Sequence, residues 1–198
     1  MLTRGFYEKC REVKTWKGLR LCAIDGSQLR LPKENAVTEE FGLHTGNEKH
    51  TGCAMALGSV YYDLLNHLIV DASINPTRAS ERDCAASHLA QAGEKDLVIY
   101  DRGYNAFWLY ALHNMRGIPF CMRAKVNRGK EFKHFADSGK TQEIISLSPS
   151  PVSIQKCEEK GLSTAPIKLR LIRVELPGEV EVLITNLLDE KQYGSEYF

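Results

Sequence analysis

The sequence predicts a mixed α/β fold, in which helices flank a sheet of antiparallel and parallel strands. Residues 97–100 (LVIY) form a short apolar run that ends at Asp101, which is typical of a strand buried on both faces. Residues 21–24 (LCAI) lead to Asp25 in the same way. The third observation is the order of the predicted elements: three strands, then a helix, a strand, a helix and a strand. This order indicates an antiparallel meander followed by βαβ crossovers.

The composition is that of an ordinary globular protein. The chain has 198 residues, of which 43% are hydrophobic and 26% charged, and its formal net charge is +1. It therefore has the length of one large domain or of a domain with an insertion, and it lacks a global basic signal for nucleic acid. The sequence has no apolar run of the ~20 residues that a membrane helix needs, and its start has no signal-peptide pattern, so we expect a cytoplasmic protein. The six cysteines are scattered without a C-x-x-C pair, which favours a reducing compartment and no structural zinc.

The first half of the chain contains the predicted meander. Residues 1–19 form a lead-in segment, helical around residues 6–13. The first strand begins at Arg20, reaches Asp25 and continues to Leu31 past a glycine bulge at Gly26. Two further strands are expected over the following runs, joined by a hairpin turn at residues 63–66: residues 51–62 and 67–74.

Two predicted helices alternate with strands in the next part. Ser80 has the character of an N-cap, and Gly93 is a plausible end for the helix that follows it. The strand that leads to Asp101 comes next. Asn105 is expected to cap a helix that ends at Gly117, and residues 118–126 form another strand.

The composition changes after Ala124, and we divide the chain there. Residues 20–124 are the predicted core, and residues 125–186 a β-rich insertion with little helix, broken at residues 148–151 (SPSP). Strands are expected on either side of a Pro177-Gly178 turn. Residues 187–198 form a polar tail that stops without a capping element.

Asp25 and Asp101 are the candidate catalytic and metal-binding residues. If their strands are parallel neighbours, both carboxylates lie at one edge of the sheet, ~4–8 Å apart, where they suit Mg²⁺ or Mn²⁺. The alternative is that each aspartate is only a turn or cap residue. A haloacid-dehalogenase-like phosphatase is excluded, because its nucleophile position is Ala23 here.

Clustered cations are the candidate DNA contacts. Five of them fall within eleven residues, and two more share one face of a predicted strand. They are Arg123, Lys125, Arg128, Lys130, Lys133, Lys168 and Arg170. The alternatives are a solvated loop for the first five and protection of an edge strand for the last two.

Four motifs, in this order, resemble the DDE transposases of the insertion-sequence-four type. The similarity covers roughly Trp16 to Tyr193. The motifs are residues 23–27 (AIDGS), the hairpin at residues 61–63 (YYD), residues 99–104 (IYDRGY) and residues 183–187 (LITNL). The resemblance implies a ribonuclease H-like fold whose β-rich insertion separates the second and third catalytic acids.

The resemblance also implies a function. Asp25 and Asp101 would be the first and second catalytic carboxylates, which hold two Mg²⁺ or Mn²⁺ ions for phosphodiester chemistry on transposon-end and target DNA. A homodimer on bacterial nucleoid DNA, without a membrane partner, is expected by the same resemblance.

The third acid of the family is a glutamate in a Y-x-x-R-x-x-x-E signature. The sequence ends before such a signature, and Glu190 and Glu196 lack its tyrosine and arginine. We therefore expect the chain alone to be inactive. An inert DNA-binding remnant and an unrelated magnesium-dependent nuclease on the same fold stay open as alternatives.

Overall fold

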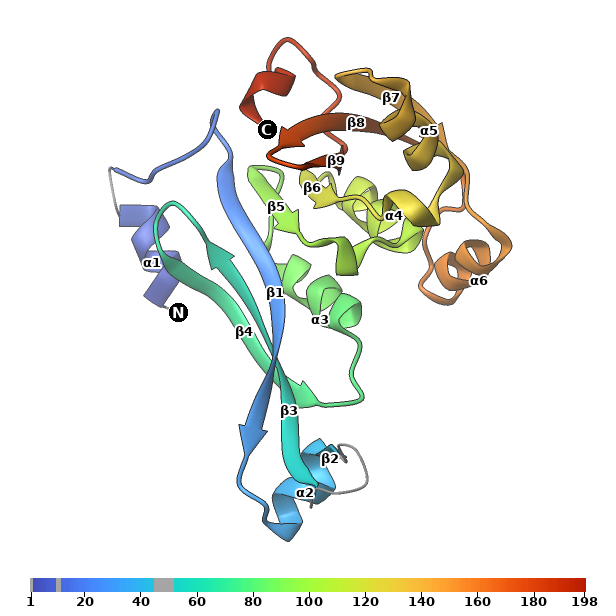
Figure 1. Cartoon of the computed structure of the whole chain (residues 1–198). Helices are drawn as coiled ribbons and strands as arrows, with labels where there is room; N and C mark the ends of the chain where they lie inside the picture. The colour runs from blue at the N-terminus through green and yellow to red at the C-terminus, as the bar shows by residue number, and fades with distance from the viewer. Residues whose placement is uncertain (1, 10–11, 45–51) are drawn as a thin grey trace. The chain divides into compact units, whose positions relative to one another are not determined.

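The computed structural model describes residues 2–9, 12–44 and 52–198, and the chain divides into two units (Figure 1). The first unit comprises residues 1–14 and 22–92, and the second residues 15–21 and 93–198. Each unit has strands and helices of its own and is described by itself. Across the described residues, none of the helices has the length and apolar character needed to span a membrane.

Antiparallel strands form the sheet of the first unit. They are β1 (Arg20–Leu31), β2 (Leu43–His44), β3 (Cys53–Asp63) and β4 (Leu68–Pro76). β3 pairs with β1, β2 and β4, and the predicted β3–β4 hairpin is confirmed (Figure 1). The predicted glycine bulge is wrong, because the β1–β3 register runs without a shift from Cys22↔Asp63 to Leu31↔Ala54. The irregularity lies instead between β3 and β4, at Tyr61 and Tyr62.

The turn between β3 and β4 is organised by a buried carboxylate. Asp63 is 0% exposed and accepts hydrogen bonds from the backbone N–H groups of Leu65 and Asn66, at 3.1 and 3.0 Å. The hydroxyl of Tyr7, on α1 (Leu2–Lys9), donates to the same carboxylate at 2.7 Å. These bonds compensate the cost of burying the charge, so Asp63 fixes both the turn and the position of α1.

Two other helices complete the first unit. α2 (Asn35–Phe41) precedes β2, and α3 (Glu81–His88) begins after Ser80, the predicted N-cap residue. α3 ends before the predicted Gly93 and continues as a short 3₁₀ turn, Leu89–Gln91. His88, the last residue of α3, is 1% exposed. Its ring bonds Asp71 at 2.8 Å and Ser59 at 3.1 Å, which ties α3 to β4 and β3.

The second unit contains a mixed sheet with the order β5-β6-β9-β8-β7. Its strands are β5 (Asp96–Tyr100), β6 (Phe120–Arg123), β7 (Gln142–Leu147), β8 (Ile167–Leu176) and β9 (Glu179–Thr185). β5 and β6 are parallel, as expected for strands joined by a crossover helix, and the other pairs are antiparallel. The Pro177-Gly178 turn between β8 and β9 is confirmed, with Gly178 at φ 87°.

The crossover helix α4 (Phe107–Arg116) connects β5 to β6 and ends at Gly117, as predicted, with a left-handed φ of 64°. Its N-cap is Ala106 and not Asn105, which has another role described below. At its end, His113 Nδ1 bonds the Ile118 carbonyl at 3.0 Å, and His113 Nε2 bonds the Tyr100 hydroxyl at 2.9 Å. These bonds join α4 to β5 and to the start of β6.

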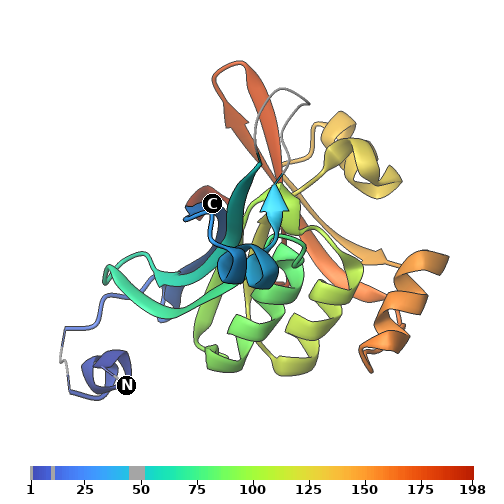
Figure 2. The ribbon, with the colours of Figure 1, turned by 90° about the horizontal axis from the view of Figure 1, so that it is seen from below.

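The region after Ala124 contains two helices that the sequence analysis did not predict. α5 (Lys130–Ser138) occupies part of the expected basic loop, and α6 (Pro151–Glu159) begins within the expected break (Figure 2). Ser150 is the N-cap of α6 and accepts a hydrogen bond from Ser153 N–H, and Pro151 stands in its first turn. The SPSP run therefore starts a helix, because proline suits the first helical turn.

The chain's last residues pack on the second unit. Leu187 and Tyr193 are buried with Leu19, Leu97 and Cys121 in one apolar cluster. The described cysteines are free thiols, and Cys10 lies outside the described residues.

Candidate functional site

Asp101 stands at the carboxyl end of β5, where the sequence analysis placed it. The strand before it is buried, and the chain then turns into a short 3₁₀ segment, Arg102–Tyr104. The Tyr104 N–H donates to the Asp101 carbonyl at 3.1 Å and closes this turn. The Asp101 side chain is 53% exposed, so its carboxylate is accessible to a ligand.

Asp25 lies inside β1 rather than at its end, because the strand continues to Leu31. It pairs with Val60 of β3, and its side chain is exposed. One carboxylate oxygen accepts the Gly26 N–H at 2.9 Å. Asp25 belongs to the first unit and Asp101 to the second, so the expected spacing of the two carboxylates stays a prediction.

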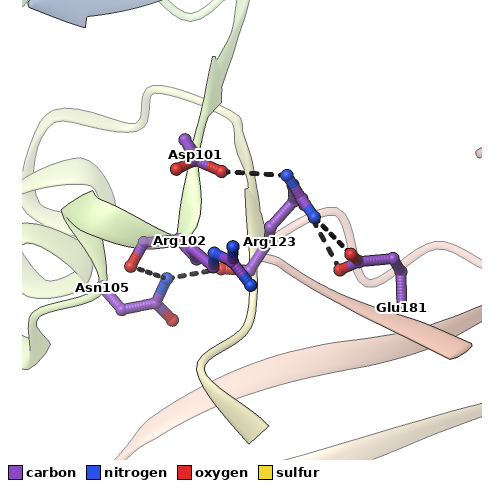
Figure 3. Close-up of polar contacts among 5 residues, drawn as sticks. All are labelled: Asp101, Arg102, Asn105, Arg123 and Glu181. Atoms are coloured by element: carbon purple, nitrogen blue, oxygen red, sulfur yellow. Dashed lines mark hydrogen bonds and ion pairs between the residues drawn. The ribbon is translucent and has the colours of Figure 1, made fainter. Parts of the chain in front are cut away.

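Arg123 bridges the carboxylates of Asp101 and Glu181 (Figure 3). It is the last residue of β6, and its Nη1 contacts Asp101 Oδ1 at 3.2 Å. On the other side, Arg123 Nε donates to Glu181 Oε2 at 3.2 Å, and Nη2 donates to Glu181 Oε1. The guanidinium thus binds Glu181 with two bonds and Asp101 with one.

The strand pairing explains why Glu181 reaches Arg123. Arg123 of β6 lies opposite Leu183 of β9, and Glu181 is two residues away on the same face of that strand. The hydrogen bond to Glu181 is the main cause that raises the pKa of Arg123 above its ordinary value, and the charge of Asp101 adds to it. Arg123 is therefore a fixed cation within an acidic cluster.

Asn105 connects the Asp101 loop to β6. Its side-chain amide donates to the Arg102 carbonyl at 3.2 Å and to the Arg123 carbonyl at 2.5 Å. Its own carbonyl oxygen accepts the Tyr110 hydroxyl of α4 at 2.9 Å. One side chain thus joins the loop after β5, the end of β6 and the crossover helix, which sets where Asp101 stands relative to Arg123 (Figure 3).

The predicted DNA-binding residues fall into separate groups. Lys130 and Lys133 are exposed on the first turn of α5, where they line an open hollow with Val126, Asn127 and Gly129. Lys168 is exposed and Lys125 half-buried, while the side chain of Arg128 lies outside the described part of the structure.

The predicted DNA contact at Arg170 is wrong, because this side chain is 0% exposed and does not present a DNA-binding surface. β8 is not an edge strand but lies between β7 and β9. The Arg170 guanidinium donates to the carbonyl of Tyr193 and to the side chain of Gln142, so it holds the last part of the chain on this sheet.

The donor chemistry of the two aspartates fits a hard divalent cation. Asp25 and Asp101 each offer exposed carboxylate oxygens, which are the ligands that Mg²⁺ and Mn²⁺ prefer. Within residues 2–9, 12–44 and 52–198, no three His, Cys, Asp or Glu side chains gather as a metal site.

Comparison with known proteins identifies relatives. Residues 16–164 match the family described as "Transposase DDE domain". The chain is 26% identical over 185 residues to the transposase InsG of insertion sequence element IS4 from Escherichia coli, covering 90% of this chain and 40% of that protein. It is 28% identical over 103 residues to the putative transposase InsZ of the same organism, covering 52% of this chain and 34% of InsZ.

A solved structure supports the fold. The chain resembles a piggyBac transposase in a synaptic complex with hairpin DNA, with a TM-score of 0.52 and 9% identity, over 86% of this chain and 34% of the other. The expected ribonuclease H-like fold is thereby confirmed. The chain spans less than half the length of each of these proteins.

Proposed function

Because the chain belongs to the transposase DDE domain family, we propose that it is the part of a DNA transposase that carries the first two catalytic aspartates, Asp25 and Asp101. The observation that carries this proposal is the position of Asp101. Its exposed carboxylate stands at the carboxyl end of a buried parallel strand, inside the matched segment, and its loop is fixed by Asn105. Asp25 lies in the same matched segment.

The proposed chemistry is hydrolysis and transfer of DNA phosphodiesters. Divalent ions, Mg²⁺ or Mn²⁺, supply this chemistry when bound, because they activate an attacking oxygen and stabilise the leaving one. The contribution of the protein is to hold Asp25 and Asp101 as rigid ligands: β1 fixes the first, and the Asn105 contacts fix the second. Preorganised carboxylates need little rearrangement when the ions and DNA arrive.

The proposed substrates are transposon-end DNA and target DNA, bound by two copies of the protein. The exposed lysines Lys130, Lys133 and Lys168 would contact the phosphates, together with the half-buried Lys125. Replacing Lys130 and Lys133 with alanine should weaken binding to all DNA sequences similarly and reduce the salt slope by about 2, since each lost phosphate contact reduces it by about 1. Fluorescence anisotropy across a salt series measures this slope, with Lys156→Ala as the control, because Lys156 already pairs with Glu159 on α6. An unchanged slope would show that Lys130 and Lys133 are solvated surface residues that do not contact DNA.

The catalytic assignment can be tested by strand cleavage. The complete reading frame that encodes this chain is expressed with Asp25→Ala or Asp101→Ala and incubated with end-sequence DNA and Mg²⁺ or Mn²⁺. Both variants should lose cleavage and keep DNA binding, because the carboxylates hold ions and the lysines hold the phosphates. Asp137→Ala, an exposed carboxylate on α5, is the matched control and should cleave at the parental rate. Parental cleavage by either active-site variant would remove that aspartate from the catalytic site.

A further inference from the structure

We propose that Glu181 is a positioning residue, which holds the Arg123 guanidinium beside Asp101 and thereby sets how readily the Asp101 carboxylate takes up a divalent ion. The proposal rests on the proposed function, in which Asp101 is a metal ligand. It adds a residue from β9, a strand that carries neither catalytic aspartate.

The geometry assigns Arg123 mainly to Glu181. Two guanidinium nitrogens, Nε and Nη2, reach the two Glu181 oxygens, whereas one nitrogen reaches Asp101. The Glu181 side chain is 14% exposed, compared with 53% for Asp101, so the more buried carboxylate makes the paired contact (Figure 3). Paired bonds of this kind fix the orientation of a guanidinium more firmly than a single bond does.

The Arg123 guanidinium opposes metal binding at Asp101. A guanidinium and a divalent ion are both positively charged, so they repel each other and compete for the Asp101 oxygens. Arg123 must therefore turn away from Asp101, or weaken its contact, when an ion binds there. Glu181 makes this possible, because it keeps Arg123 neutralised after the contact with Asp101 is lost.

Two substitutions should consequently change metal affinity in opposite directions. Arg123→Gln removes the competing cation, so Mn²⁺ should bind at Asp101 roughly tenfold more tightly, given the strength of a nearby charge at a partly exposed site. Glu181→Gln leaves Arg123 with Asp101 as its remaining carboxylate partner among those drawn in Figure 3, so Mn²⁺ should bind about threefold more weakly. In the double variant, affinity should follow Arg123→Gln, since Glu181 acts only through Arg123.

The experiment is a Mn²⁺ titration of the 198-residue chain, with free Mn²⁺ measured by electron paramagnetic resonance. Glu175→Gln is the matched control, because it breaks the 3.2 Å Arg173–Glu175 ion pair on the same β8–β9 hairpin without a link to Asp101. Circular dichroism and the urea midpoint establish that each variant is folded. Asp101→Asn identifies the fraction of Mn²⁺ binding that depends on Asp101.

The outcomes separate this proposal from the proposed function. Loss of affinity in both single variants, or no change in either, would overturn the role of Glu181 while Asp101→Asn still reduced binding. A further loss in the double variant relative to Arg123→Gln would make Glu181 a metal ligand itself, which also contradicts the proposal. If Asp101→Asn leaves Mn²⁺ binding unchanged, the metal site assigned to Asp101 fails, and the proposed function fails with it.

Discussion

Asn105 shows how much of the site depends on one side chain. Its amide and carbonyl groups bond the Arg102 carbonyl, the Arg123 carbonyl and the Tyr110 hydroxyl. Asn105→Ala should lower the free energy of unfolding by ~1–3 kcal/mol, because it removes these hydrogen bonds, two of which are partly buried. Urea denaturation measures the change. Asn114→Ala is the control, since Asn114 makes an exposed bond to Asn186, and it should stay within about 0.5 kcal/mol of the parent. Equal losses in the two variants would contradict the role of Asn105.

Single residues were predictable where the signal is local. Asp25 and Asp101 could be found because each follows a short apolar run in the sequence. Glu181 could not, because it reaches the site only through the pairing of β6 with β9, two strands far apart in the chain. Arg170 was misplaced for a related reason: alternation along the sequence gives the face of a strand, but it does not reveal that the last part of the chain lies over this face, where Arg170 bonds the Tyr193 carbonyl.

At the scale of elements, the end of α4 should make the fold sensitive to acid. Burial lowers the pKa of His113 from 6.5 to about 4 and raises that of Tyr100 well above its ordinary value. Neutral His113 therefore accepts a hydrogen bond from the Tyr100 hydroxyl at Nε2 and donates one from Nδ1 to the Ile118 carbonyl. Above pH 6.5 the His113 imidazole is neutral in both the folded and the unfolded chain. As the pH falls towards 4, only the unfolded chain takes up the proton, so stability is lost across this window, by up to ~3 kcal/mol.

Urea denaturation at pH 7.5 and pH 4.5 measures this loss. His113→Gln should be less stable than the parent at pH 7.5 and should lose less stability on acidification, because it lacks the titrating ring. His134→Gln, at an exposed position on α5, should keep the parental loss on acidification. The mechanism is wrong if His113→Gln and the parent lose equal stability between the two pH values.

The elements of the first 124 residues follow patterns that a sequence displays directly. Buried runs, turn residues and the Gly117 helix end predicted β5, α4 and β6 in the right order. The two missed helices lie in polar sequence. α6 did carry a local signal, a serine N-cap followed by proline, but serine and proline are equally typical of a break between elements. α5 carries two phenylalanines at helical spacing, Phe132 and Phe135, which are its buried residues, but a charged segment with so few apolar positions is also typical of a solvated loop.

At the scale of the whole molecule, the proposed function requires that Asp25 and Asp101, from different units, share ions. The two-metal chemistry of the family would place their carboxylates ~4–8 Å apart. Fe²⁺ in place of Mg²⁺, with ascorbate and peroxide, generates radicals that cut the backbone next to the bound ion. A shared ion should therefore cut the chain near residue 25 and near residue 101 in the same reaction, and excess Mg²⁺ should suppress both cuts.

The aspartate variants make this test decisive. Each carboxylate supplies too few oxygens to hold a six-coordinate ion firmly by itself, so Asp25→Asn and Asp101→Asn should each remove both cuts. Asp137→Asn, on the exposed face of α5, should leave both cuts in place. Separate sites would behave differently: Asp101→Asn would abolish cutting near residue 101 and spare the cut near residue 25. That pattern would separate the two aspartates and leave Asp101, with Arg123 and Glu181, as an isolated acidic cluster.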